Sequence, residues 1–142
     1  MSVAIECFYE GELKCRARHD RSGSEVWTQA PADNGGKGMK FSPTDLMATA
    51  LGTCMLTIMG LVAQRRGLDI RGTRVRVVKE MVSEPVRRIG ALRIQIEVAG
   101  GERLSVEDRV RLERGALQCP VKHSLHPEVE VSVEWRWGNG KR

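Results

Sequence analysis

The feature that most constrains the fold is a long uncharged stretch, because residues 46–64 contain no Asp, Glu, Lys or Arg. Before it, Ser42-Pro43-Thr44-Asp45 is a pattern typical of a helix start. The Ser42 hydroxyl can accept a hydrogen bond from an unpaired backbone N–H, and Pro43 suits the first helical position. The Asp45 side chain can reach back to the Ser42 backbone N–H, as in a capping box. We expect the helix to run to about Arg66 and to end at Gly67.

A helix of this length without charge either spans a bilayer or is buried on several sides. Its threonines and glycines argue against a membrane. At about 100° per residue, the bulky side chains form one stripe (Met47, Ala50, Leu51, Cys54, Ile58 and Leu61), and the small ones gather opposite (Thr49, Gly52, Thr53, Gly60 and Ala63). Neither face suits water, and one small sheet cannot cover both, so we expect a homodimer that encloses the helix. Gly52 and Gly60 are the expected points of closest backbone approach, with the partner's helix as one possible neighbour.

The remaining segments predict a single α+β domain over residues 1–142 with a largely antiparallel sheet. Strand-like alternation runs from the N-terminus to Gln29, and residues 31–40 are a Gly-rich loop. Further patterns predict paired strands over 69–82 and 91–98, a helix that begins at Ser105 with its charges in solvent, and a last strand over 129–137. The solvated charges of that helix are Glu107, Arg109, Arg111, Glu113 and Arg114.

Composition and the N-terminus narrow the class of protein. Aromatic residues make up 4% of the chain, and the net charge of +5 is spread along it, so we expect no nucleic-acid partner. The first residues lack the basic and apolar segments of a signal peptide, which favours the cytoplasm. No G-x-S-x-G, G-x-G-x-x-G or Walker motif is present, so the hydrolase, dehydrogenase and NTPase classes lose their usual support.

The four cysteines lie far apart in the sequence, which indicates independent thiols in a reducing compartment. We expect Cys7 and Cys15, on the strands, to be small buried hydrophobes. Cys54 lies in mid-helix, where desolvation raises the pKa of a thiol and makes it inert unless the fold brings a cation or a donor. Cys119 precedes Pro120 at an expected N-cap, where unpaired N–H groups favour a thiolate. By local chemistry Cys119 is therefore the more reactive thiol, although an N-cap without a redox role is equally open.

A zinc site is a second, less favoured interpretation of the two cysteines Cys54 and Cys119. Cys119, His123 and His126 have C-x3-H-x2-H spacing, and Cys54 could supply a fourth ligand. Pro127 and the absence of a C-x-x-C pair disfavour this reading. We expect neither a metal nor a cofactor, and treat the histidines as solvated.

Two segments resemble the OsmC/Ohr superfamily: Ser42-Pro43-Thr44-Asp45-Leu46 leading through Ala50-Leu51-Gly52-Thr53-Cys54, and Cys119-Pro120-Val121-Lys122-His123-Ser124-Leu125. The resemblance covers nearly the whole chain. It implies an intertwined α+β homodimer with two central helices, and thiol-dependent reduction of organic or inorganic hydroperoxides in the oxidative stress response. In that scheme Cys54 attacks the peroxide, Cys119 closes a disulfide with it, and a dithiol such as a lipoyl group restores both.

The sequence departs from the family pattern at the activating residues. Peroxidase members have a glutamate ten residues before the first cysteine and an arginine in an early strand, whereas here the glutamate position is Thr44. Asp45 is one residue away, about 180° around the helix from Cys54, and has a capping task. Arg16 and Arg18 are the nearest candidate arginines, yet their alternation places them opposite Cys15, where they can simply be solvated.

Two hypotheses follow. The first is a thiol peroxidase whose site comprises Cys54 and Cys119, with Arg16, Arg18 and Asp45 as candidate supporting residues. The second is a non-catalytic dimer of the same fold that binds a small apolar ligand or senses oxidation.

Overall fold

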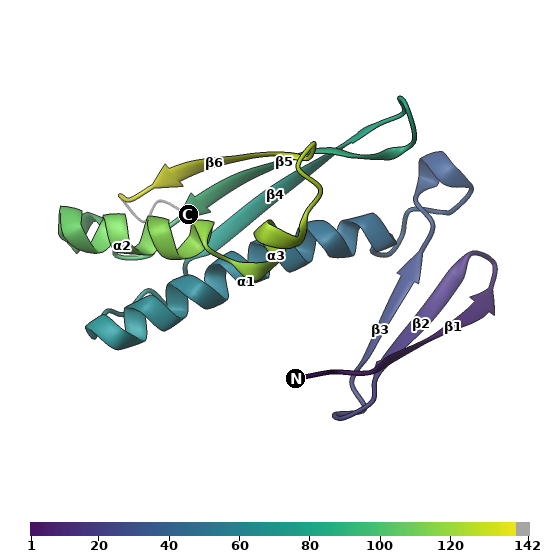
Figure 1. Cartoon of the computed structure of the whole chain (residues 1–142), viewed down its shortest axis with the longest axis horizontal. Helices are drawn as coiled ribbons and strands as arrows, with labels where there is room; N and C mark the ends of the chain where they lie inside the picture. Colours follow the sequence, from purple (N-terminus) through teal and green to yellow (C-terminus); the bar gives the residue numbers. More distant parts are fainter. Residues whose placement is uncertain (139–142) are drawn as a thin grey trace. The chain divides into compact units, whose positions relative to one another are not determined.

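The computed structural model describes residues 1–138 and divides into two compact units, Met1–Met47 and Ala48–Arg142. Helix α1, Pro43–Arg66, is shared by both units (Figure 1). The α+β class is confirmed. The single domain over residues 1–142 stays a prediction.

The first unit contains an antiparallel sheet in the order β1-β2-β3. Its strands are β1 (Ile5–Gly11), β2 (Lys14–His19) and β3 (Glu25–Gln29), followed by a 3-10 turn, η1 (Ala32–Asn34). Glu12 and Leu13 have positive φ angles of 55° and 62° in the β1–β2 turn. The strand-like N-terminal alternation and the loop after it are therefore confirmed.

The prediction that Cys7 and Cys15 are buried was wrong. Cys7 is exposed and Cys15 is half-buried. They share a face of the sheet with Ile5 and Tyr9, which are 61% and 68% exposed. Alternation decides which face a side chain occupies, but burial requires a covering layer, and within the first unit no described element covers the apolar face of this three-stranded sheet.

Both ends of α1 follow the sequence signals. At its start the Asp45 backbone N–H donates to Ser42 Oγ at 3.1 Å, and the Ser42 N–H donates to Asp45 Oδ2 at 2.9 Å. At its end Gly67 has a φ of 68°, and the Leu68 N–H donates to the Ala63 carbonyl at 2.9 Å. This is a capping box followed by a glycine C-cap of the Schellman type.

Helix α1 is also long and apolar enough to cross a membrane, with a mean hydropathy of 1.9 over an 18-residue window. A core helix of a soluble protein passes the same test. One face of α1 is such a core face, since it packs against a sheet.

The second unit is built on the sheet β4-β5-β6, with β4 (Arg74–Val82) antiparallel to β5 (Arg88–Glu97) and β6 (Glu130–Arg136) parallel to β5. Strand β4 begins at Arg74 and not at Asp69, because residues 71 and 72 form a turn in which Thr73 Oγ1 donates to the Ile70 carbonyl. A short turn η2 (Gly101–Arg103) and helices α2 (Val106–Leu117) and α3 (Pro120–Ser124) connect β5 to β6. This crossover explains the parallel pairing.

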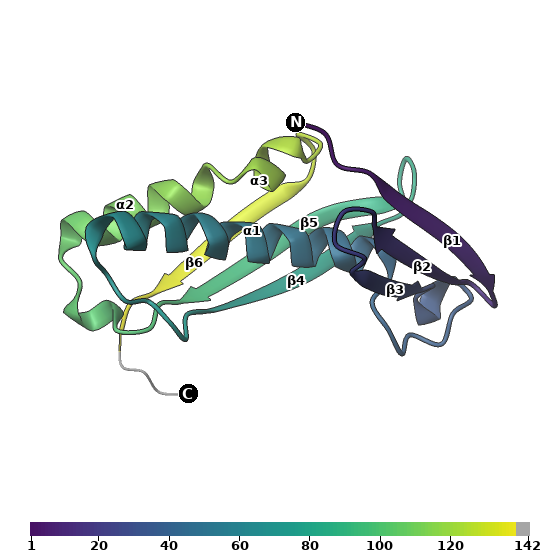
Figure 2. The same cartoon turned by 90° about the horizontal axis from the view of Figure 1, so that it is seen from below.

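Helices α1 and α2 lie over one face of this sheet (Figure 2). The core between them contains, among others, Leu51, Met55, Met59, Leu92, Ile94, Ile96 and Leu112, all at most 2% exposed. The predicted alternation of β5 and β6 is confirmed, with β6 less deeply buried than β5.

The core face of α1 is not the predicted bulky stripe. Its buried residues are Ala48, Leu51, Gly52, Met55, Met59 and Ala63. Two residues of the predicted stripe, Met47 and Leu61, are 46% and 43% exposed. The face of α1 that packs against the sheet lies between the two predicted faces, because small residues let the helix come close to β4.

Gly52 marks that close approach. A Cβ atom at Gly52 would lie 3.0 Å from Val77 Cγ2 and 3.4 Å from Val75 Cγ1, whereas one at Gly60 would meet nothing within 4 Å. The close approach at Gly52 is therefore to β4 of the same chain and not to a partner's helix.

Helix α2 begins as predicted, since the Asp108 N–H donates to Ser105 Oγ at 3.1 Å. Leu112 and Ala116 are buried, whereas Val110 and Leu117 are 37% and 40% exposed. The prediction that Arg109 is a solvated charge was wrong. Its guanidinium donates to the Gly101 carbonyl at 2.9 Å and lies over the Trp137 ring.

Candidate functional site

The second unit brings two cysteines together that lie far apart in the sequence. Cys54 projects from the middle of α1, and Cys119 stands directly before α3. Both belong to the same apolar cluster, and the Cys54 thiol is one of the neighbours that raise the pKa of Cys119. Two thiols that interact within one cluster are candidates for a disulfide.

Cys119 occupies the N-cap position that the sequence predicts. Its Sγ accepts the Lys122 backbone N–H at 3.3 Å, and Pro120 takes the first helical position. These N–H donors stabilise a thiolate. The side chain of Cys119, however, is fully buried.

Burial dominates the electrostatics of this thiol. It raises the pKa of Cys119 above its ordinary value, the N–H groups of Lys122 and Val121 act in the opposite direction, and the interaction with Cys54 raises the pKa further. The expectation that the N-cap favours a thiolate at Cys119 was therefore wrong. Local sequence shows the donors of an N-cap but not the apolar layer that surrounds it.

Cys54 is the more accessible of the two thiols, because it is half-buried where Cys119 is fully buried. The fold thus places a second thiol, Cys119, in the same apolar cluster as Cys54.

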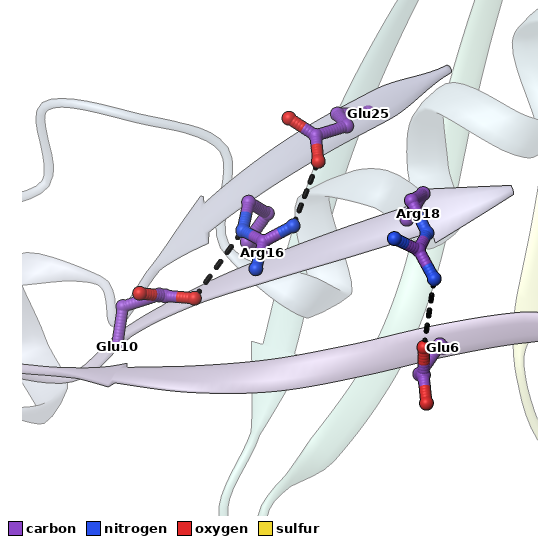
Figure 3. Close-up of polar contacts among 5 residues, drawn as sticks. All are labelled: Glu6, Glu10, Arg16, Arg18 and Glu25. Atoms are coloured by element: carbon purple, nitrogen blue, oxygen red, sulfur yellow. Dashed lines mark hydrogen bonds and ion pairs between the residues drawn. The ribbon is translucent and has the colours of Figure 1, made fainter. Parts of the chain in front are cut away.

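The arginine candidates lie in the first unit (Figure 3). Arg16 Nη1 donates to Glu25 at 2.7 Å, and its Nε donates to Glu10 at 3.2 Å. These hydrogen bonds raise the pKa of Arg16, although burial acts against them. The guanidinium also stacks 4.4 Å from the centre of the Phe8 ring. Arg16 is therefore held within its own sheet and is not a freely solvated charge.

Arg18 makes a similar but simpler contact. Its Nη2 donates to Glu6 Oε1 at 3.0 Å, and the guanidinium lies 5.9 Å from the centre of the Phe8 ring (Figure 3). Strand register places both arginines on the face opposite Cys15, as the alternation predicts.

Asp45 has the structural role that its capping pattern predicts, because its carboxylate accepts the Ser42 N–H. Thr44, at the position of the family's glutamate, has its Oγ1 3.2 Å from Ser42 Oγ. Both side chains thus contribute to the start of α1. A catalytic role for Arg16, Arg18 or Asp45 stays a prediction.

Within residues 1–138, the structure contains no group of three or more His, Cys, Asp and Glu side chains that could hold a metal ion. His123 and His126 are exposed, and His126 Nδ1 accepts the Glu128 N–H at 3.1 Å.

Sequence reasoning predicted unpaired N–H groups at the Cys119 N-cap, and the structure identifies the Lys122 N–H as a donor to the sulfur. It missed the packing of Cys54 and Cys119 in one cluster, except through the family resemblance. No local pattern indicates that two residues so far apart meet.

The sequence matches the family described as OsmC-like protein over residues 35–134, which is more than half of the chain. The chain belongs to the OsmC-like family. Both segments that carry the cysteines lie inside the matched range.

Solved structures agree with this membership. A proposed osmotic stress induced and detoxification response protein from Psychrobacter arcticus is 40% identical, with a TM-score of 0.86 over 93% of this chain and 94% of that one. An organic hydroperoxide resistance protein from Legionella pneumophila is 15% identical, with a TM-score of 0.72 over 96% and 97% of the two chains. At that identity the second structure supports the OsmC-like fold alone.

A human protein named as tRNA-dihydrouridine(20a/20b) synthase-like is 28% identical to this OsmC-like chain over 90 residues. The match covers 63% of this chain but only 28% of the human protein.

Proposed function

We propose that this OsmC-like protein is a thiol-dependent peroxidase that reduces organic or inorganic hydroperoxides. The observation that carries the proposal is that the half-buried Cys54 and the fully buried Cys119 pack in one apolar cluster, in which Cys54 helps to raise the pKa of Cys119. Other OsmC-family structures named as organic hydroperoxide resistance proteins support such a role at the level of the family.

The cycle starts at Cys54, because a peroxide reaches the more accessible sulfur first. The Cys54 thiolate attacks one peroxide oxygen, the O–O bond breaks, and the leaving alkoxide takes a proton to become an alcohol. Cys54 is then a sulfenic acid. The Cys119 thiol condenses with it, which forms the Cys54–Cys119 disulfide and releases water.

A dithiol closes the cycle. It attacks the disulfide, returns Cys54 and Cys119 to thiols, and leaves as its own cyclic disulfide, so that each turn oxidises one dithiol and reduces one peroxide. A lipoyl group is the reductant that we propose. Such a cycle requires a compartment in which thiols stay reduced, and we therefore also propose the cytoplasm.

The test is consumption of cumene hydroperoxide with dihydrolipoamide as reductant, in the parent protein and in Cys54→Ser and Cys119→Ser. We expect no turnover in Cys54→Ser. Cys119→Ser should consume about one equivalent of peroxide and then stop, with a sulfenic acid at Cys54 that dimedone traps. Cys7→Ser is a matched control and should turn over at the parental rate. Equal rates in the parent and in both site variants would exclude the proposal.

A sensor that is oxidised once is the second candidate function. It is favoured by the engagement of Arg16 and Arg18 with glutamates of their own sheet, which leaves the thiols of the second unit without an assigned cation. Repeated cycles of peroxide reduction would exclude a sensor. A single slow oxidation that forms the disulfide without turnover would favour it.

We also propose that the working form is a homodimer, as OsmC-family proteins commonly are. The support is the amount of uncovered apolar surface, on the sheet face with Ile5 and Tyr9 and on the side of α1 with Leu61. Uncovered surfaces of this kind usually mark an interface.

A further inference from the structure

The outward face of the β4-β5-β6 sheet, away from the helices, carries charged side chains in cross-strand rows. Strand register aligns Arg74, Glu97 and Arg136 in one row. The next row consists of Arg76, Gln95 and Glu134. Directly opposed residues on a sheet lie within about 5 Å of each other, so three guanidinium groups share a small area.

These rows border a depression of about 370 Å3. It is lined by Arg74, Val75, Arg76, Gln95, Glu97 and Arg136. Sites for small molecules have volumes of about 300–1,000 Å3, so the depression can hold a small metabolite or an inorganic anion.

The lining contains three arginines and one glutamate, and Glu134 lies beside it in the Arg76 row, so three positive charges face two negative ones. Arg74 pairs with Glu97 at 2.8 Å, and Arg136 pairs with Glu134 at 3.1 Å, which fixes both guanidinium groups in place. Arg76 is exposed, and within residues 1–138 its guanidinium has neither an ion pair nor a hydrogen bond. Its donors are thus available to a ligand.

The other end of the same face has the opposite character. There Arg93 is shared by two carboxylates, Glu80 at 2.8 Å and Glu130 at 3.4 Å. Excess positive charge is therefore confined to the depression around Arg76, and it is not a general property of the face.

We propose that this depression is an anion-binding site for a small molecule that carries a phosphate group, with Arg76 as the main contact. The planar guanidinium fork donates two parallel hydrogen bonds to phosphate oxygens, and charge-assisted bonds of this kind are the strong ones. Arg74 and Arg136 add positive potential. The site lies on the face of the sheet opposite the core that contains the cysteines, so it does not depend on the proposed thiol chemistry.

The test is titration calorimetry with inorganic phosphate and with pyrophosphate at low ionic strength. The variants are Arg76→Gln and, as a matched control, Arg65→Gln, which removes the same charge from an exposed position in the last turn of α1. We expect saturable binding that weakens about tenfold or more in Arg76→Gln, in line with the loss of a charge-assisted contact. Arg65→Gln should bind like the parent, and added salt should weaken all binding.

Because Arg76 is exposed and forms no ion pair or hydrogen bond with the part of the chain that the structure describes, Arg76→Gln should melt like the parent. Arg136→Gln offers a second, independent removal from the lining. The proposal would be overturned by the absence of saturable binding to the parent. It would equally be overturned if Arg76→Gln and Arg65→Gln weakened binding to the same extent, since the anion would then respond only to net charge.

Discussion

At the scale of single residues, Cys119 shows how burial and local donors compete. The N–H groups at the start of α3 lower the pKa of its thiol, but loss of contact with water raises it more. A helix of five residues offers few donors, whereas the apolar surroundings act on the whole sulfur atom. The raised pKa predicts a protonated thiol at Cys119 at neutral pH, in agreement with the resolving role that the proposed cycle gives it.

This balance predicts the order in which the thiols are alkylated. At about pH 7 iodoacetamide should modify Cys54 well before Cys119, because Cys119 is both buried and protonated. The rate at Cys119 should increase only as the pH rises above the ordinary thiol value of 9.0. Mass spectrometry of digested samples measures both rates, with unfolded protein as a control in which the difference disappears. Faster labelling of Cys119 at neutral pH would contradict this account.

At the scale of secondary-structure elements, an ion pair joins the end of α1 to the start of α2. Arg66 in the last turn of α1 donates to Asp108 in the first turn of α2. The Arg66 hydrogen bond lowers the pKa of Asp108, burial opposes this, and Ser105 contributes a smaller lowering. The contact places each charge at the helix end where the helix dipole favours it.

Asp108→Asn should therefore lower the melting temperature at neutral pH. A carboxyl group whose pKa is lower in the folded state stabilises the fold above its ordinary value of 3.8, and that contribution is lost as the pH falls through the folded value. The difference between variant and parent should accordingly shrink in acid. Glu107→Gln, in the same turn but with an exposed partner, is the control and should have a smaller effect at every pH. A pH-independent difference for Asp108→Asn would exclude this linkage.

The two helical glycines of α1 give a second prediction at this scale. Gly52→Leu should destabilise the fold by at least about 1 to 3 kcal/mol, because its side chain would overlap with Val75 and Val77. Gly60→Ala should instead stabilise by up to about 1 kcal/mol through helix propensity, since its own chain leaves the space open. Urea unfolding measures both changes. A destabilising Gly60→Ala would indicate that another chain packs against Gly60.

At the scale of the whole molecule, each unit leaves apolar surface uncovered. Alanine, threonine and leucine side chains of α1 face away from the sheet, and Thr53 and Thr57 satisfy their hydroxyl groups by donating to backbone carbonyls of the helix itself, each at 2.8 Å. A helix face whose hydroxyl groups already have hydrogen-bond partners can be covered by another protein surface.

We therefore predict an obligate homodimer. Sedimentation equilibrium at micromolar concentration should give twice the mass of the 15.8 kDa chain, and the unfolding midpoint should rise with protein concentration. A well-folded monomer at that concentration would contradict the prediction.

The sequence predicted those features that short-range chemistry controls. The start of α1 at the Ser42–Asp45 capping box and its end at Gly67 follow from backbone N–H groups and carbonyls that need partners within a few residues. The N-cap at Cys119 and the alternation of β5 have the same origin. Each of these signals lies within one turn or one strand, so a single sequence contains it.

Tertiary structure decided what depends on the neighbours of a residue. Helix periodicity identified two faces of α1, but the sheet packed against a third, because the fit of Gly52 to β4 depends on side chains of another element. Cys7 is exposed and Cys119 is buried because only the assembled layers determine depth. The pKa of the Cys119 thiol is raised and not lowered for the same reason, since its desolvation and its interaction with Cys54 come from segments that meet only in the folded chain.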